Sequence, residues 1–160
     1  MSQIQGQNPA TGEQVVDVIG TVTRVAGFMG VKQKRFTMVV TERRLIFAEF
    51  TSEKLKQLTR EAKEHARDEG KGALGRFGAT MKVSAMAAEP YRTMAPDAAL
   101  AENPDNFAID RTDVLKVKFK LGAGETGTEM MIIKAGSGTY KFHVNSMRRL
   151  KEALARVGIG

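Results

Sequence analysis

The pattern most similar to a binding site is a group of three cations just before an apolar run. Lys32, Lys34 and Arg35 precede the run that begins at Phe36. Lysine and arginine side chains bind phosphate, but a full phosphate site needs several cations converging on one pocket with backbone donors. The pattern therefore leaves three readings open: specific phosphate recognition, looser attraction to an anionic lipid surface, and a solvated strand edge.

A second cationic pattern is a row of alternating lysines. Lys116, Lys118 and Lys120 share one face of a predicted strand, at about 6 to 7 Å spacing, and could follow a phosphate backbone. Proteins that bind single-stranded nucleic acid interleave such cations with stacking aromatic rings. The chain is only 6% aromatic and has no tryptophan. The sequence therefore disfavours nucleic acid as a partner, and lysines on a strand also discourage edge-to-edge aggregation.

The residues that could support catalysis do not form a recognisable set. The glycine-rich stretches 70–72 and 122–128 lack the Gly-x4-Gly-Lys-Ser/Thr order in which a lysine reaches bound phosphates. Asp110 and Asp113 have no histidine or nucleophile near them in sequence, so capping and turn roles are favoured. We expect no enzymatic activity, no small-molecule substrate and no bound cofactor.

Metal binding and membrane spanning find equally little support in the sequence. The chain has no cysteine, and its two histidines, His65 and His143, are far apart, which disfavours a zinc site. No apolar run approaches the roughly 20 residues that cross a bilayer, and the polar start, 1–14, does not resemble a signal peptide. We therefore expect a cytoplasmic protein.

The net charge of +7 is unevenly distributed along the chain. The segment 51–105 contains nine basic and nine acidic residues, so the whole excess falls on the remainder of the sequence. Such an excess favours anionic partners, namely nucleic acid, a phospholipid surface or an acidic protein, although it also serves solubility.

The candidate binding residues are positioned mainly by predicted strands. Apolar, β-branched runs predict strands over 17–26, 36–40 and 45–50, the last two joined by a short polar turn. Four more are predicted after a long interruption: one from Asn106, then 113–121, 130–134 and 139–144. In the strand 113–121, Leu115, Val117, Phe119 and Leu121 are expected to face the core and the three lysines to face solvent.

The interruption, 51–105, is predicted to be helical. A helix capped by Ser52 or Thr51 is expected, ending near Glu69-Gly70. A second, glycine-loosened amphipathic helix is expected to end at Glu89-Pro90, and a short one begins at Pro96.

The amphipathic stripe of the second helix makes it a candidate interface. Leu74, Phe77 and Met81 recur at helical spacing on it. These side chains could pack on the domain or on a second copy of the chain, or could insert into an anionic membrane. The sparse aromatic bulk favours protein contact, so we expect self-association or a protein partner, with membrane binding as the alternative.

A closing helix is predicted after Asn145 or Ser146. Met147, Leu150, Leu154 and Val157 lie on one face of it, and Gly158 ends it. A sheet with one apolar face must be covered, and this helix has the width to cover a strongly bent antiparallel sheet.

Several short motifs resemble the bacterial pleckstrin-homology-like and GRAM-like groups. Thr41 to Phe47, Thr-Glu-Arg-Arg-Leu-Ile-Phe, resembles their Thr-x-x-Arg-Leu/Ile-Ile/Phe turn and third strand. The segments 106–114 and 140–144 resemble later elements, although Asp110 stands where a proline is common in the family.

The resemblance implies a fold and only a broad function. The fold is mainly β, a pleckstrin-homology-like, strongly bent seven-stranded antiparallel barrel capped by a C-terminal helix. A polar leader, 1–16, precedes a single domain, 17–157, which the helical insertion 51–105 interrupts between strands three and four. Such domains are mostly interaction modules. In lipid-binding members, cations near the position of Lys32 bind inositol phosphates, but the spacing and count here depart from that pattern.

Overall fold

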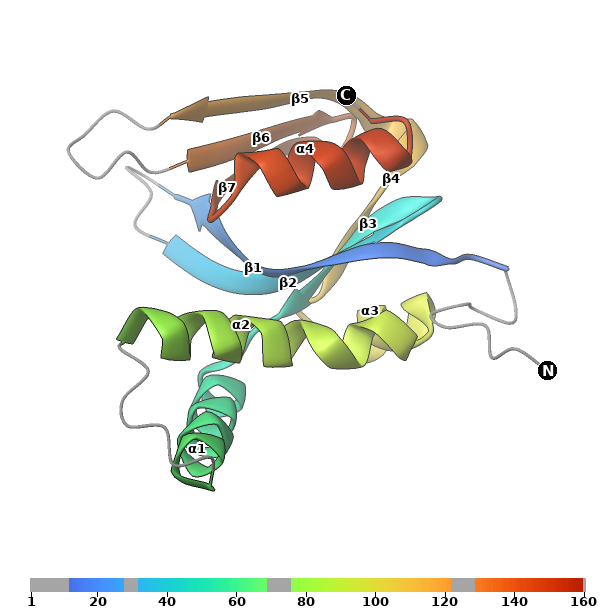
Figure 1. Ribbon diagram of the computed structural model, residues 1–160. Helices are drawn as coiled ribbons and strands as arrows, with labels where there is room; N and C mark the ends of the chain where they lie inside the picture. Colours follow the sequence, from blue (N-terminus) through green and yellow to red (C-terminus); the bar gives the residue numbers. More distant parts are fainter. Residues whose placement is uncertain (1–11, 28–31, 69–75, 122–128, 160) are drawn as a thin grey trace.

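The computed structural model describes residues 12–27, 32–68, 76–121 and 129–159 (Figure 1). Its secondary structure is mainly β, with seven strands and four α-helices among these residues. The strands are β1 (Val15–Ala26), β2 (Lys32–Thr41), β3 (Arg44–Glu49), β4 (Phe107–Asp110), β5 (Val114–Leu121), β6 (Glu129–Ala135) and β7 (Gly138–Val144). The helices are α1 (Ser52–Asp68), α2 (Arg76–Thr93), α3 (Pro96–Ala101) and α4 (Met147–Arg156), and a 3-10 turn, η2 (Arg111–Asp113), joins β4 to β5.

The seven strands form one antiparallel sheet in the order β4-β3-β2-β1-β7-β6-β5. β4 and β5 are its two edges, and no pairing between them closes the sheet in the described part of the chain. The expected barrel is therefore an open sheet. The predicted hairpins are confirmed: β2 pairs with β3, and β6 pairs with β7 across the two-residue turn 136–137.

The sheet bends strongly, as contacts between distant strands show. Phe47 on β3 and Phe142 on β7 stack with ring centroids 4.8 Å apart. Three strand-to-strand steps separate β3 from β7, which amounts to about 14 Å in a flat sheet. The two halves of the sheet therefore fold toward each other and enclose the main core.

Helix α4 fills the open side of this bent sheet. Leu150, Ala153, Leu154 and Val157 belong to the same buried cluster as the inward side chains of the strands. The predicted cap is confirmed, since the Ser146 side chain accepts a hydrogen bond from the Arg149 backbone N–H. The described fold extends two residues past the predicted end of the domain, because Ile159 is also buried in this cluster.

Strand β1 serves both halves of the sheet, because it pairs with β2 along its length and with β7 through 22–25. Its register against β2 slips by one residue between Ile19 and Val22, which marks a bulge. Helix α2 crosses β1 at this bulge: a Cβ placed on Gly20 would lie 2.7 Å from the Ser84 backbone oxygen. The crossing therefore requires glycine at position 20.

The insertion covers the outer face of one half of the sheet (Figure 1). Val18, Val39 and Ile46, from β1, β2 and β3, form a second buried cluster with Ala88 and Tyr91 of α2. The insertion lies between β3 and β4, as predicted, and it packs outside the sheet while α4 packs inside.

Helix α1 packs on α2 through a third, smaller cluster. Ala62 is buried there with Val83 and Ala87, and Leu55 and Leu58 pack against them. These apolar side chains of α1 are thus packed within the chain. None of the helices in the described ranges is long and apolar enough to cross a bilayer.

Two details of the elements differ from the sequence-based expectations. Helix α2 continues through Pro90 to Thr93, because buried Tyr91 holds its last turn against the sheet and tertiary packing overrides the proline. On β5, Val117 and Phe119 pack against the core as predicted, but Leu115 and Leu121 are exposed. A register shift between Val114 and Lys116 removes Leu115 from the alternation.

Residues before the predicted domain start also take part in the fold. Strand β1 begins at Val15, and Glu13 is buried. The Glu13 carboxylate accepts hydrogen bonds from Arg44 Nε at 3.0 Å, Arg44 Nη2 at 2.9 Å and Thr41 Oγ1. Arg44 also pairs with Asp97 of α3. This group ties the start of the described chain to β3 and to the insertion.

A buried tyrosine joins the three helices of the insertion. The Tyr91 hydroxyl donates to Glu102, and Lys54 Nζ donates to the Tyr91 oxygen at 2.8 Å. Burial, followed by the hydrogen bond to Glu102, raises the pKa of Tyr91 well above its ordinary value. The neutral phenol is therefore the form that the folded state favours.

Replacing Tyr91 by phenylalanine should lower the free energy of unfolding by about 1 kcal/mol at neutral pH, because hydrogen bonds are lost while the ring remains. Above pH of about 10 the unfolded chain ionises its tyrosine first, so the contribution of Tyr91 decreases as pH rises. The difference between wild type and Tyr91→Phe in urea unfolding should therefore shrink from pH 7 to pH 11. Tyr140→Phe is the control, and an equal loss in both variants would contradict the assignment.

Candidate anion-binding face

The cross-strand register places five lysines on one surface of the sheet. Directly opposed residues of antiparallel strands project from the same face. Lys116 on β5 opposes Lys134 on β6, and Lys118 opposes Ile132, which in turn opposes Lys141 on β7. By alternation Lys120 lies on this face as well. The five residues that we call the lysine face are Lys116, Lys118, Lys120, Lys134 and Lys141.

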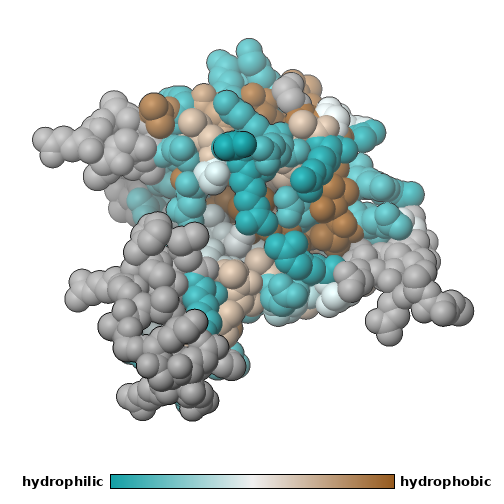
Figure 2. Space-filling model, in the orientation of Figure 1, coloured by the Kyte–Doolittle hydropathy of each residue, from teal (hydrophilic) through white to brown (hydrophobic). Residues whose placement is uncertain are grey.

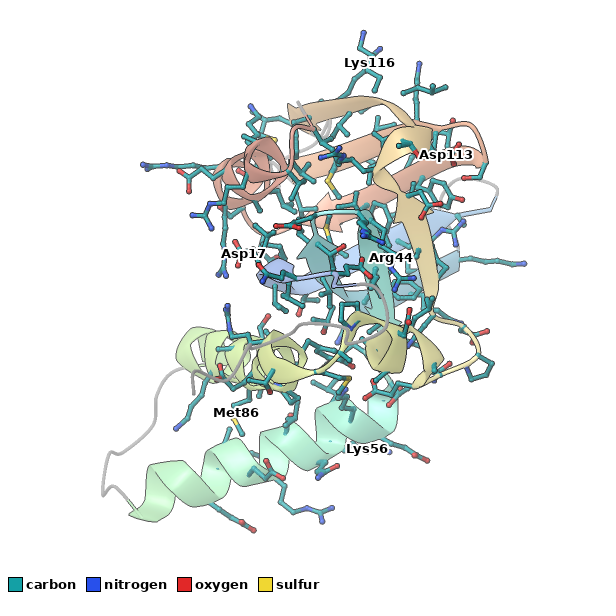
Figure 3. All side chains as sticks on the ribbon, turned by 90° about the vertical axis from the view of Figure 1, so that its right-hand side faces the viewer. Asp17, Arg44, Lys56, Met86, Asp113 and Lys116 are labelled. Carbon is teal, nitrogen blue, oxygen red and sulfur yellow. The ribbon has the colours of Figure 1, made fainter. Side chains whose placement is uncertain are left out.

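The lysine face contains cations without carboxylates. All five lysines are exposed, and none forms an ion pair with any residue that the structure describes. Glu129, the nearby acid on β6, lies on the opposite face and accepts a hydrogen bond from the Met147 backbone N–H. Figure 3 shows Lys116 projecting away from the sheet.

Protection of an edge strand against pairing with another chain explains only some of the five lysines. Three of the lysines stand on β5, an edge strand, where lysine and a bulge discourage pairing with another chain. Lys134 and Lys141 stand on β6 and β7, which have neighbours on both sides. Lys116 and Lys134 also face each other directly, an arrangement of like charges that destabilises a sheet by a fraction of a kcal/mol, about 0.2 to 1. This pair of like charges therefore lowers the stability of the fold and does not contribute to it.

The insertion leaves this surface uncovered. Neither of the two clusters formed by α1, α2 and α3 includes a residue of β5, β6 or β7. Ile132, at the centre of the lysine face, is nonetheless only 9% exposed. Its cross-strand neighbours are Lys118 and Lys141, whose aliphatic stems can cover it while their ammonium groups stay in water. The upper edge of the molecule in Figure 2, where β5 lies, shows hydrophilic residues interspersed with hydrophobic ones.

The face continues across β1 to β2 along one row of opposed residues. From Lys120 the row runs through Met130, His143 and Thr23 to Arg35. His143 Nδ1 is buried and has no hydrogen-bond partner among the described residues. The row thus adds one exposed arginine to the same surface.

The three cations singled out from the sequence do not lie together. Arg35 projects from the outer face of β2, whereas Lys32 and Lys34 project from the face that carries Phe36. Lys34 is already paired, with Asp105 at 2.8 Å and Glu49 at 3.8 Å. Its hydrogen bond to Asp105 raises the pKa of Lys34 and lowers that of Asp105. Of the three, Arg35 is the residue that projects from the same side of the sheet as the lysine face.

The candidate interface on the insertion is only partly visible. Leu74 lies outside the described residues. Phe77 and Met81 lie in the first turns of α2, where the backbone alone is described. Their role in self-association or membrane contact stays a prediction.

A second group of cations lies around Asp17 and is engaged in packing. Arg149 and Arg156 of α4 approach its carboxylate to 3.4 and 3.9 Å, and Arg92 of α2 approaches it to 3.9 Å. Arg149 also donates to the Val18 carbonyl oxygen. These arginines fasten both helices to β1, so their charge is partly neutralised.

A shallow cavity of about 400 Å³ lies between β5 and the end of α4. Its lining contains no carboxylate, histidine, serine or cysteine; the lining residues are Arg111, Val114, Leu115, Lys116, Val117, Gly158 and Ile159. Asp113 lies nearby and holds the turn between β6 and β7, since its carboxylate accepts from the Ser137 backbone N–H. The cavity thus offers cations and apolar surface but no catalytic set.

Comparison with known proteins does not assign a family. No protein-family model matches the chain, and no curated protein matches it. Among solved structures it is similar to the C-terminal domain of an unknown protein from Leishmania infantum, with 13% identity and a TM-score of 0.45, over 92% of this chain and 84% of that one. At this identity and TM-score the likeness identifies no shared function.

Proposed function

We propose that this chain is a non-enzymatic interaction module of pleckstrin-homology-like fold that binds an anionic partner through its lysine face. The observation that carries the proposal is the set of five exposed lysines on the uncovered half of the sheet, with no carboxylate among them. A concentrated field of one sign attracts and orients partners of the opposite sign.

Three features support the pleckstrin-homology-like assignment. The strand order is that of a meander whose first strand also pairs with the last, α4 fills the open side of the bent sheet, and the helical insertion falls between β3 and β4. These agree with the element order that the resemblance implies. Fold alone gives no activity, so the function rests on the lysine face.

The insertion is better suited to cover the sheet than to bind a partner. Several apolar residues of α1 and α2, among them Leu58, Ala62 and Val83, are packed within the chain. Self-association or membrane contact through Phe77 and Met81 stays a prediction, and Lys34 is already paired with Asp105 and Glu49. The lysine face is available without any rearrangement.

Retention on immobilised heparin, a sulfated polyanion, tests the proposal. The triple variant Lys118→Gln/Lys134→Gln/Lys141→Gln should elute at a clearly lower salt concentration than wild type, because it loses three of the five charges of the lysine face. The control Lys56→Gln/Arg60→Gln/Lys63→Gln removes the same charge from exposed positions on α1, which also carries three glutamates. It should elute near wild type.

The fold of the triple variant is checked by thermal unfolding. Because Lys134→Gln relieves repulsion with Lys116, the melting temperature should equal or exceed that of wild type. Equal shifts of elution in the two triple variants would mean that net charge alone governs retention, and the lysine face would then be no site.

A further inference from the structure

We infer that the partner of the lysine face is a nucleic-acid double helix, contacted through its phosphodiester backbone and independently of base sequence. This inference rests on the proposed function and names the partner. The sequence alone disfavoured nucleic acid, because it showed only the row on β5. The register adds Lys134 and Lys141 from two further strands and turns that row into a two-dimensional face.

The dimensions of the face suit a duplex backbone. From Lys116 to Lys120 it extends about 14 Å along β5, and from β5 to β7 it extends about 10 Å. Double-stranded DNA carries one negative charge per about 1.7 Å of helix axis, so a length of 14 Å presents about eight phosphates. These phosphates belong to both strands and lie around the whole helix, so the lysines meet those on the near side without a unique alignment.

The chemistry of the side chains argues for sequence-independent binding. Lysine presents a compact point charge, whereas base reading relies on paired donors and acceptors such as those of arginine, asparagine and glutamine. Within β5, β6 and β7 this face carries no such residue. Contacts to phosphate position a protein on a duplex but do not specify sequence.

Two alternative partners fit the surface less well. A single strand would need stacking rings, and the outward residues of β5, β6 and β7 include no phenylalanine, tyrosine or tryptophan. A membrane needs an apolar anchor beside the cations. At the centre of the face Ile132 is nearly buried. The two exposed leucines stand at opposite ends of β5: Leu121 belongs by alternation to the other side of the strand, and Leu115 is a single apolar side chain beside Lys116.

The test is the salt dependence of duplex binding, measured by fluorescence anisotropy with 20-base-pair DNA duplexes of two unrelated sequences. If five lysines each neutralise one phosphate, the logarithm of the binding constant should fall with the logarithm of salt concentration with a slope of about −4.5. In Lys118→Gln/Lys134→Gln/Lys141→Gln the slope should be about −1.8. The α1 control variant should keep the wild-type slope, and the two sequences should bind within about threefold of each other.

Further arms separate the sources of phosphate. An RNA duplex, a single strand of the same length, and vesicles of neutral or anionic phospholipid are measured with the same three proteins. Either duplex binding with the predicted slopes supports the inference, and the stronger of the two identifies the helix form. Binding that differs more than tenfold between the two DNA sequences would overturn the sequence-independent part.

The outcomes also distinguish the inference from the proposed function. Lysine-dependent binding to anionic vesicles or to the single strand, without binding to either duplex, overturns the inference and leaves the proposed function standing. Duplex binding also overturns the inference if the slope of its salt dependence is the same in wild type and in Lys118→Gln/Lys134→Gln/Lys141→Gln, since the contacts then lie elsewhere. If the two triple variants behave alike on heparin and on every other probe, both the inference and the proposed function are overturned.

Discussion

Replacing Arg44 by leucine should lower the free energy of unfolding by about 3 to 5 kcal/mol, the range seen when one partner of a buried ion pair is removed. Glu13 has a side chain only 2% exposed, and Arg44 supplies its counter-charge and two of its hydrogen bonds. The leucine would leave this carboxylate inside the fold with less compensation. In a chain of this size the loss corresponds to a fall in melting temperature of about 10 °C, measurable by circular dichroism.

The neighbouring arginine is a matched control for this substitution. Arg43 is exposed in the same turn, and its side chain forms no hydrogen bond or ion pair with the residues that the structure describes. Arg43→Leu removes the same charge and should change stability by no more than about 0.5 kcal/mol. Coincident melting curves for Arg43→Leu and Arg44→Leu would show that the ion pair does not stabilise the fold.

Replacing Gly20 by valine should destabilise the protein by about 3 kcal/mol, the upper part of the range for overpacking. The new Cβ would lie 2.4 Å from Ser84 Oγ and 2.7 Å from the Ser84 backbone oxygen. A side chain could rotate away, but the backbone oxygen can move only with α2. Hydrogen exchange of α2 amides should therefore accelerate more than that of β6 and β7, because the helix is displaced from β1.

Two further variants isolate the cause. Thr21→Val removes the hydrogen bond between the Thr21 and Ser84 hydroxyl groups but adds no contact, and should cost about 1 kcal/mol. Gly20→Ala introduces the same Cβ with no further atoms. Combining it with Ser84→Gly relieves the contact with Oγ alone and should rescue stability only in part. Full rescue would contradict a close approach of backbones. Heparin retention of Gly20→Val should stay near wild type at temperatures where it is folded, because the lysine face lies on the other half of the sheet.

Local patterns predicted most of the secondary structure. The strand β5 with Val117 and Phe119 facing the core, the turn after Thr41, the cap at Ser146 and the helical insertion all follow from residue type and spacing within a few positions. Expectations that depended on contacts between distant segments were less accurate. Pro90 ends a helix on local grounds, but the packing of Tyr91 against the sheet carries α2 beyond it.

The candidate site could be predicted only in part, because a face of a sheet is defined by register. Lys116, Lys118 and Lys120 could be recognised as a row, since alternation along one strand is visible in the sequence. Lys134 and Lys141 join them only through the pairing of β5 with β6 and of β6 with β7. Conversely, Lys34 and Arg35 are adjacent in sequence and project from opposite faces of β2. The burial of Glu13 could not be predicted from the sequence, because a single acid in a polar segment is normally exposed. Its burial follows from the position of Arg44 beside it.

The two tyrosines of this tryptophan-free chain lie in different parts of the molecule. Tyr91 is enclosed where the insertion meets the outside of the sheet, and Tyr140 stacks on Phe107 beside the main core. Intrinsic ultraviolet emission therefore has two sources at separate locations. In Tyr140→Phe the signal reports on the helical cover alone, and in Tyr91→Phe on the sheet alone, so melting of each can be followed optically without an attached label.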